Sequence, residues 1–550
     1  MYYNTREPFF VFSFTKSDVE VKEIDKFLDL LSKSGVGELL ERKLKDRDYT
    51  NGGRPNYNSF NMLAMIIYSF AFLDSSLRGM EDSCKSNMRV MYIMNNHRPT
   101  YKTIGNFINE FILPNMNEIF SMITKEILKE CNLTIDCVFI DGSKFEANCN
   151  KYKFVWKPTT FHKRLTEKVT TILSKYEIDT VVEDGIISSG EIAQSLIKLD
   201  KILNKYDLND KSNKEHKLAY NELINCFEKG IEYEKKEEIC GPNRKSYYKT
   251  DHDATAMCLK EDYYSGLGSN MHAAYNVQLS VSNGLIVTFY PSQSRLDMPD
   301  FIPTLEKQFK YYGEYPKNVC ADAGYGSIDN YRFLNEHNIG NYVKHFSWEG
   351  EVHGNNPRQY TFNDNNTITC LNGITGYKLD KEPYHPKKKS AVFYKVEGCN
   401  ACPFKDYCKR YMANKSEDYK LFEVVEEQQR YVNQSEKNLL SPEGIEIRVN
   451  RSCQVEGAFG IIKQDMKYER FRRVSLEKIS LEFMLVCLGF NIRKLFKYYR
   501  GQNPFTFWTR PDDLEPEEKK KPSAKRLSNK ANKKKTKSLN QEAKSSYKYK

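Results

Sequence analysis

The sequence has no long hydrophobic run and no recognisable export signal. Its longest strongly apolar stretch, Met62 to Leu73, falls short of the roughly 20 residues that span a bilayer, so we expect no transmembrane helix and no membrane partner. The N-terminal aromatic cluster, Phe9 to Phe14, is brief, follows Glu7 and lacks a basic leader or cleavage site. The 14 cysteines are therefore expected to be reduced thiols in a cytoplasm.

The excess of positive charge lies in one segment. The formal net charge is +11, but Lys519 to Lys550 holds 13 Lys or Arg against one acidic residue, Glu542, so the rest of the chain is close to neutral. Almost no large aliphatic side chains occur there to offset the entropy of folding. Residues 510–550 are therefore predicted to be a disordered basic tail, which could bind phosphates nonspecifically or only keep the protein soluble.

The length of 550 residues and the 40% hydrophobic content support several compact domains. Residues 1–130 are predicted to form a helical N-terminal domain. Asn58 to Leu73 is apolar all round, as in a buried helix, and Ser75 and Ser76 offer a cap for a helix that follows. Such a bundle could contain a helix-turn-helix that recognises the ends of a DNA segment, although most small helical bundles bind nothing.

The next part of the chain, residues 131–500, predicts an α/β domain. Asn-Gly between two β-rich runs is a strong hairpin signal. The expected order is a strand that ends at Asp141, a hairpin, a helix and a strand that ends at Asp322, in these segments: Thr134 to Ile140, Ala273 to Ser282, Leu285 to Tyr290, Phe301 to Tyr312 and Asn318 to Ala321. This order is compatible with an RNase H-like mixed sheet, in which acidic residues on the first and fourth strands are neighbours.

Two segments are predicted to interrupt this domain. Residues 157–250 are rich in charged and aliphatic residues and indicate long helices, whereas residues 345–440 are polar and too irregular for a single loop. After the second insertion, Val455 to Phe471 and Ser475 to Tyr499 are each predicted to be helical.

Three acidic residues are candidate metal ligands: Asp141, Asp322 and Glu456. If they converge, their hard carboxylate oxygens suit magnesium, and two such ions can assist phosphoryl displacement. On spacing alone, an Asp before Gly142 is equally a turn residue. Lys463 lies two helical turns after Glu456 and could meet a phosphate, although a plain surface pair is the alternative.

Several motifs together resemble bacterial insertion-sequence DDE transposases, most closely the group numbered eleven eighty-two. The likeness covers roughly residues 20 to 500. It rests on these segments: Gly53-Arg54-Pro55 with Tyr57, Asp141 to Trp156, Asp251 to Thr255, Tyr275-Asn276-Val277-Gln278, Ala321 to Tyr325, Arg451 to Lys463 and Asn491 to Lys494.

The resemblance implies that Asp141, Asp322 and Glu456 are the DDE triad. Two Mg²⁺ (or Mn²⁺) ions would there assist hydrolysis of a phosphodiester at the element's end, followed by attack of the freed 3′-hydroxyl on target DNA. The implied partners are the terminal inverted repeats, target DNA and a second copy of the chain, in a bacterial cytoplasm at the nucleoid. Related enzymes show a Tyr, Arg, Glu, Lys signature around the third acid. Lys463 fits it, but Arg451 lies one residue too far from Glu456, and Arg448 stands where a tyrosine is expected.

Four cysteines predict a possible structural zinc site: Cys370, Cys399, Cys402 and Cys408. Zinc prefers four tetrahedral thiolates, and the spacing of Cys399 and Cys402 is typical of one half of such a site. His385 could replace Cys370, and unligated thiols are the alternative.

Three further predictions stay open. Asp251, His252 and Asp253 could line the active site, although a solvated loop is favoured, and Trp156 could stack on unpaired bases. Two rival functions remain: a noncatalytic DNA-binding regulator that descends from a transposase, and a nuclease that cuts without joining.

Overall fold

The computed structural model describes residues 19–45, 56–206, 211–242, 244–266, 270–381, 390–410 and 415–527. Four features of the sequence lie outside the described residues: Phe9 to Phe14, Gly53-Arg54-Pro55, His385 and residues 528–550 of the basic tail.

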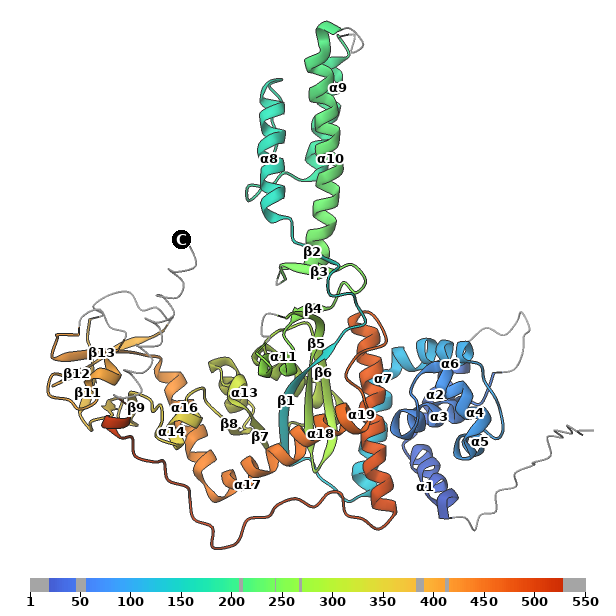
Figure 1. The fold of residues 1–550 in the computed structure, drawn as a ribbon, viewed down its shortest axis with the longest axis vertical. Helices are drawn as coiled ribbons and strands as arrows, with labels where there is room; N and C mark the ends of the chain where they lie inside the picture. The colour runs from blue at the N-terminus through green and yellow to red at the C-terminus, as the bar shows by residue number, and fades with distance from the viewer. Residues whose placement is uncertain are drawn as a thin grey trace, which may run out of the picture.

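A six-stranded mixed sheet forms the centre of the protein (Figure 1). Its strands are β1 (Cys137–Glu146), β4 (Thr255–Met257), β5 (His272–Ser282), β6 (Leu285–Ser292), β7 (Asn318–Ala321) and β8 (Gly340–Val343). They follow the order β4-β5-β1-β7-β8, and β6 also pairs with β5. β5 is antiparallel to β1 and β6, whereas β7 is parallel to β1 and β8.

Several local predictions are confirmed in this sheet. Asn283 and Gly284 join β5 to β6 with φ of 50° and 74°, as a tight hairpin turn requires. The predicted bounds of β7 and of the helix α12 (Phe301–Tyr312) are also correct. One boundary was wrong: β1 continues to Glu146, because β5 pairs with it as far as Ala274, so Asp141 lies inside the strand and not at its end.

The two faces of the sheet pack in different cores. Val138 and Ile140 belong to a core with residues of α12, whereas the alternate residues Phe139 and Phe145 belong to a larger core with α19 (Leu476–Tyr499). Because side chains alternate along a strand, Asp141 lies on the α19 face. The ring of Phe145 packs there within 5.2 Å of the ring of Phe483, measured between centroids.

The N-terminal segment is helical, with α1 (Val19–Lys33), α2 (Val36–Lys45), α3 (Ser59–Phe72), α4 (Leu77–Ser86), α5 (Met88–Ile93), α6 (Tyr101–Phe107), η1 (Ile108–Ile112) and α7 (Leu113–Glu130). The caps follow the sequence: Asn58 accepts the Asn61 N–H, and Ser76 accepts the Gly79 N–H. α3 and α7 pack against α19, so these helices share a core with the sheet.

No single helix in the described part of the chain is long and apolar enough to cross a bilayer. Within the same residues, α3 and α4 taken together are long and apolar enough to cross a bilayer, but the chain bends by 102° between them.

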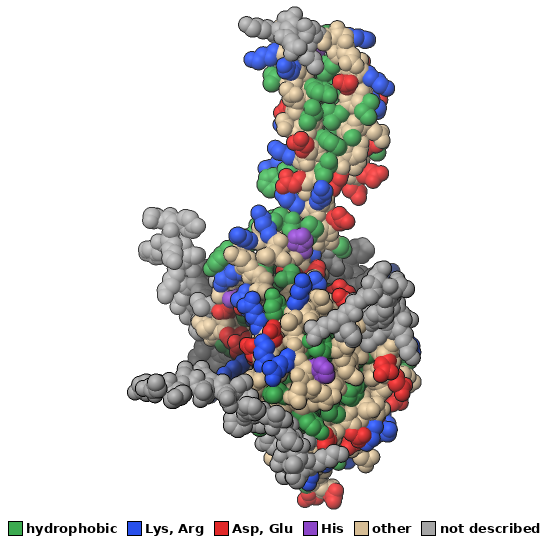
Figure 2. Space-filling view, turned by 90° about the vertical axis from the view of Figure 1, so that its right-hand side faces the viewer, with side chains coloured by type: hydrophobic (Ala, Val, Ile, Leu, Met, Phe, Trp, Pro, Cys, Tyr) green, Lys and Arg blue, Asp and Glu red, His purple; other side chains and the backbone are tan. Residues whose placement is uncertain are grey.

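The first insertion forms an arm that projects from the body (Figure 1). A short ribbon, β2 (Phe154–Trp156) and β3 (Ser246–Tyr248), leads into α8 (Thr159–Ser174), α9 (Ser189–Leu203), η2 (Lys211–Asn213) and α10 (Lys214–Cys240), and α11 (Lys260–Tyr264) follows before β5. The arm has a core of its own around Leu165, Val169 and Leu199. Seen from the side of the N-terminal helices, Lys and Arg side chains gather on the body below the arm (Figure 2).

The second insertion contains regular structure that the sequence did not predict. Its antiparallel sheet has the order β13-β12-β11-β10-β9 and a core around Phe362, Tyr394 and Phe422. The strands are β9 (Tyr360–Phe362), β10 (Ile368–Cys370), β11 (Thr375–Lys378), β12 (Val392–Glu397) and β13 (Tyr419–Val424). The helical elements around these strands and after β6 are η3 (Met298–Asp300), η4 (Ala323–Tyr325), α13 (Ile328–Glu336), α14 (Trp348–Val352), α15 (Lys405–Cys408) and α16 (Glu426–Leu440).

The predicted helix from Val455 to Phe471 was wrong in extent and type. The chain passes from α17 (Pro442–Arg451) through η5 (Ser452–Glu456), α18 (Gly457–Gly460) and η6 (Ile461–Asp465), and both η5 and η6 are π-helical. The helical backbone ends at Asp465, and beyond it Phe471 donates its N–H to the carbonyl of Glu146, the last residue of β1.

The chain after α19 returns across the molecule to the second insertion. Glu517 donates its N–H to the Leu440 carbonyl at 2.9 Å, and Lys520 donates to the Val352 carbonyl at 3.1 Å. Residues 510–527, which were predicted to belong to a disordered tail, therefore make regular contacts.

Candidate active site

The structure brings Asp141, Asp322 and Glu456 together at the middle strands of the central sheet. Ile140 on β1 pairs in parallel with Ala321 on β7, so Asp141 and Asp322 occupy the next, adjacent positions of neighbouring strands. Glu456 ends η5, which contacts β1 and β5. Three segments that are far apart in the sequence thus contribute one carboxylate each.

The charges of these carboxylates act on one another. Burial of Asp141 raises its pKa to about 6, and the charges of Asp322 and Glu456 act in the same direction, while Arg451 opposes them. The carboxylate oxygens of Asp141, Asp322 and Glu456 do not all lie within 4.8 Å of one another. Among the described residues, the one group of three possible ligands whose atoms all lie within 4.8 Å of one another is elsewhere.

Arg451 lies among the three carboxylates. Its Nη2 donates to Glu456 Oε1 at 2.8 Å. Burial opposes its charge, but Asp141 and Asp322 outweigh this effect and raise the pKa of the guanidinium. The Nη1 atom is buried and has no hydrogen-bond partner. This arginine therefore balances part of the negative charge of the carboxylates, and its Nη1 remains available to donate a hydrogen bond.

A π-helical turn explains how Arg451 reaches Glu456. Residues five apart lie on different sides of an α-helix, whereas a π-helix closes its hydrogen bonds between residues five apart. Because η5 spans Ser452–Glu456, the extra residue between the arginine and the glutamate is absorbed. The unusual spacing in the sequence is therefore compatible with an arginine at the acidic cluster.

Lys463 and Arg448 occupy different surroundings. The Nζ of Lys463 donates to the Lys144 carbonyl of β1 at 3.3 Å and lies 5.1 Å from the Phe145 ring centroid, and burial lowers its pKa. Arg448 instead donates to Glu517 and to the Leu439 carbonyl, and it lies over the ring of Trp348. Only Lys463 is thus held against the strand that carries Asp141.

A polar network behind the sheet supports the site, and sequence reasoning missed it. A Cβ at Gly142 would lie 2.4 Å from Asp297 Oδ1, so glycine permits this close approach. Gln278 of β5 donates to Asp297 at 3.0 Å and accepts a hydrogen bond from the Tyr325 hydroxyl. Tyr325 closes the turn after Asp322, so the network ties that turn to β5. The motifs around Gln278 and Tyr325 were visible in the sequence, but their contact was not.

Asp251 and Asp253 do not form the solvated loop that was favoured. Asp251 is fully buried and accepts hydrogen bonds from the Tyr275 hydroxyl at 2.8 Å and the Ser475 N–H at 3.3 Å. Asp253 accepts the Leu476 N–H at 2.8 Å. Both aspartates therefore hold the first turn of α19, where carboxylates are favourable.

The four cysteines of the second insertion line one pocket together with Lys409 and Lys420. Cys370 ends β10 and Cys408 ends α15, while Cys399 and Cys402 lie on the turn between β12 and α15. Burial raises the pKa of Cys408 to about 11, and the other three thiols contribute to this shift. The four thiols line the same pocket, although no three of their sulfur atoms all lie within 4.8 Å of one another.

Among the described residues, one cluster has three possible metal-ligand atoms within 4.8 Å of one another, and it comprises His345, Glu351 and Glu436. Arg358 and Lys519 each form ion pairs with both glutamates. Burial lowers the pKa of His345 to about 4, so its ring is neutral near pH 7. Two cations thus balance two carboxylates, and this cluster is an ion-pair network that joins the C-terminal segment to the second insertion.

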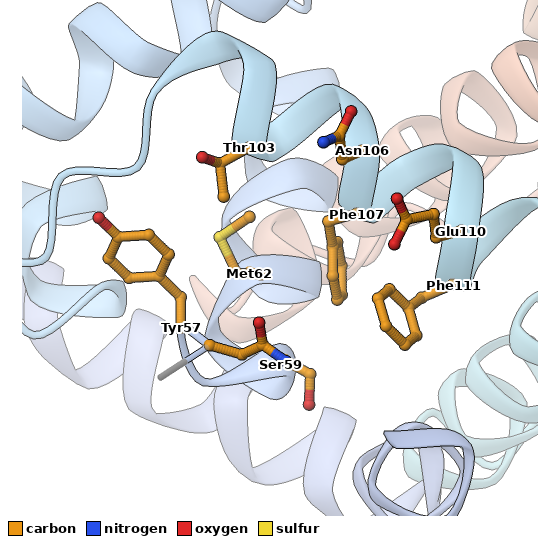
Figure 3. A pocket seen from close by; sticks show the side chains of 9 residues that line it. Tyr57, Ser59, Met62, Thr103, Asn106, Phe107, Glu110 and Phe111 are labelled. Atoms are coloured by element: carbon orange, nitrogen blue, oxygen red, sulfur yellow. The ribbon is translucent and has the colours of Figure 1, made fainter. Parts of the chain in front are cut away.

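A pocket among the N-terminal helices is lined by a different set of groups. The rings of Phe107 and Phe111 stack at 5.4 Å between centroids, and Thr103, Asn106 and Glu110 extend from the same helical stretch opposite Tyr57 (Figure 3). Among the described residues that line it, Glu110 is the one acidic side chain.

Two family models match the chain. The family described as Transposase DDE domain matches residues 369–496, and the family described as Transposase domain (DUF772) matches residues 12–110. No curated protein and no solved structure gives a match. The first segment includes Glu456, Lys463 and the four cysteines, whereas Asp141 and Asp322 lie outside it. Both matches support an insertion-sequence DDE transposase.

Proposed function

We propose that the protein is a DDE transposase that hydrolyses phosphodiester bonds at transposon ends and joins the freed 3′-hydroxyl to target DNA. The convergence of Asp141, Asp322 and Glu456 around Arg451 carries this proposal. The rival functions, a noncatalytic DNA-binding regulator and a nuclease that cuts without joining, are distinguished by the experiment below.

An RNase H-like assignment of the catalytic domain is supported by the strand order. β1 is central, the antiparallel pair β5 and β6 lies on one side of it, and the parallel strands β7 and β8 lie on the other. This arrangement puts an acidic residue on the first strand beside one that follows the fourth. It agrees with the resemblance to the insertion-sequence group eleven eighty-two.

The three carboxylates fit divalent magnesium or manganese. Three carboxylates from separate elements are hard oxygen donors, and their mutual repulsion and burial, visible in the raised pKa of Asp141, favour a bound cation. When bound, two such ions would supply the positive charge that activates the attacking oxygen and stabilises the leaving one.

The chain's own residues would orient the substrate. Asp141 is fixed by the pairing of β1 with β5, whereas Asp322 directly follows β7 and its carbonyl accepts the Tyr325 N–H. Glu456 is held by the Arg451 guanidinium until a cation competes for it. The unpartnered Nη1 of Arg451 and the ammonium of Lys463 are suitable donors for phosphate oxygens, and such contacts position DNA but do not read its sequence.

The remaining assignments follow from the same function. We assign structural Zn²⁺ to Cys370, Cys399, Cys402 and Cys408, because four thiols from three local segments line one pocket, and the nearby Lys409 and Lys420 would offset the charge of four thiolates. The N-terminal helices would recognise terminal inverted repeats, and two copies of the chain would hold two DNA ends, at the nucleoid of a bacterial cytoplasm.

A cleavage and joining assay tests the proposed function. Labelled DNA that carries the ends of the element is incubated with protein and Mg²⁺, and nicked and joined products are separated by size. We expect Asp141→Asn, Asp322→Asn and Glu456→Gln each to abolish both products while DNA binding is kept. Asp364→Asn, at an exposed position outside the site, is the matched control and should retain both.

The products distinguish the alternatives. Binding without any nick would establish the regulator, and nicks without joined products would establish the nuclease. Strand cleavage that persists in Asp141→Asn would refute the assignment of the triad.

A further inference from the structure

The ribbon of β2 and β3 at the base of the arm has an unusual charge. It follows directly from β1, the strand that carries Asp141. Residues 147–166 contain five Lys or Arg and no Asp or Glu, and residues 241–250 contain three Lys or Arg and no acid. Since most of the chain is close to neutral, this local excess marks a surface suited to an anionic partner.

Aromatic rings are exposed on the same ribbon. Tyr152 is 79% exposed, Phe154 is 44% exposed and Trp156 is 64% exposed. Phe154 and Trp156 are two residues apart on β2, so they lie on one face of the ribbon, with ring centroids 5.4 Å apart. Large rings are usually buried, and three exposed rings within five residues form a stacking surface and not a core.

The ribbon also places like charges side by side. The Lys249 N–H donates to the Lys153 carbonyl at 3.0 Å, and the Lys157 N–H donates to the Lys245 carbonyl at 2.8 Å. Neighbouring like charges on paired strands are destabilising. Within the described residues, no carboxylate forms an ion pair with Lys153, Lys245 or Lys249 to relieve this repulsion. Phosphate groups of a ligand would do so.

We propose that this basic and aromatic ribbon binds single-stranded DNA, with bases stacked on Trp156 and Phe154 and with phosphates held by Lys153 and Lys249. Single-stranded DNA fits better than a duplex, because stacking needs base faces that pairing hides. This proposal rests on the proposed function, in which cleavage exposes a strand at Asp141.

The distance along the chain agrees with that role. From Asp141 to the end of β1 at Glu146 the strand extends about 17 Å at 3.3 Å per residue, and the ribbon lies beyond it. At the rise of roughly 3.4 Å per nucleotide of one strand in B-form DNA, this distance corresponds to about five stacked nucleotides, and an unstacked strand would cover it with fewer.

Tryptophan fluorescence tests the stacking directly. The chain has three tryptophans; Trp348 is buried, and Trp508→Phe removes the other partly exposed one. In that background and in EDTA, oligothymidylate should quench the emission of Trp156. Trp156→Ala should weaken oligothymidylate binding about fivefold or more, as expected when one base no longer stacks, while Trp156→Phe should retain most of the affinity. Phe346→Ala, at a ring that is 95% exposed elsewhere, is the control and should bind normally.

The lysines provide an independent measurement. Lys153→Gln combined with Lys249→Gln should reduce the dependence of log affinity on log salt by about 0.7 for each phosphate that the protein no longer neutralises. The same pair should raise the melting temperature of the free protein, because it removes a repulsion, whereas a purely structural role would lower it. Lys437→Gln with Lys478→Gln, at exposed positions of α16 and α19, should change neither quantity.

Two results would overturn the proposal: unchanged emission of Trp156 at saturating oligothymidylate, or a change in oligomeric state in Trp156→Ala with unchanged DNA affinity, which would assign the surface to a second copy of the chain. The measurement does not depend on catalysis, because Asp141→Asn protein in EDTA should give the same quenching. Absence of joining by the unchanged protein, with intact quenching here, would refute the transposase assignment and leave the ribbon as a DNA-binding surface.

Discussion

Replacing Asp141 by asparagine should stabilise the protein when no metal is present. The carboxylate is buried beside two others, and its pKa is about 6 compared with an ordinary value of 3.8. A difference of one between the pKa of the folded and the unfolded protein corresponds to about 1.36 kcal/mol. The ionised carboxylate therefore lowers the free energy of unfolding by about 3 kcal/mol. An uncharged side chain of the same shape avoids this cost.

The pH dependence has a definite sign. Between about pH 4 and pH 6 the folded protein binds more protons at Asp141 than the unfolded chain, so this residue's contribution to stability falls as the pH rises through that window. Asp141→Asn and the unchanged protein should therefore have similar free energies of unfolding near pH 4. The advantage of the variant should grow towards about 3 kcal/mol above pH 7.

Urea unfolding in EDTA at several pH values measures this difference. Mg²⁺ should reverse the order at pH 8, because ligand binding to the folded state stabilises only a protein that keeps the ligand site. Asp364→Asn is the matched control and should show neither effect. A variant that is less stable than the unchanged protein in EDTA at pH 8 would refute the reasoning, since the ionised carboxylate would then be favourable in the fold.

Two further substitutions test the surroundings. Arg451→Gln should lower the free energy of unfolding without metal by about 2 kcal/mol, which is less than for a fully buried ion pair because Glu456 is 49% exposed. The same substitution should tighten Mn²⁺ binding, measured by calorimetry. An unchanged Mn²⁺ affinity would show that the arginine does not compete with the metal. Cys402→Ser should reduce the zinc content of protein purified without added zinc from about one equivalent, and Cys453→Ser, an exposed thiol elsewhere, should not; zinc-free unchanged protein would refute the zinc site.

Local patterns in the sequence predicted the elements that depend on neighbouring residues. The hairpin turn forms at Asn283 and Gly284 as expected, and α12 and β7 have their expected bounds, because turn chemistry and hydrophobic periodicity act over a few residues. The length of β1 was not predictable in this way, since pairing with the distant strand β5 extends it past Asp141. The sheet of the second insertion was missed because its strands are only 3 to 6 residues long and are separated by polar segments.

The sequence by itself identified the three acidic residues as candidate metal ligands and showed the motifs around them. Only the tertiary structure decided how their neighbours act. Gln278 meets Tyr325 behind the sheet because strand pairing and the turn after Asp322 bring them together, although 47 positions separate them. Arg451 meets Glu456 because the helix between them is π-helical, and a periodicity of 3.6 residues cannot reveal that change of helical geometry.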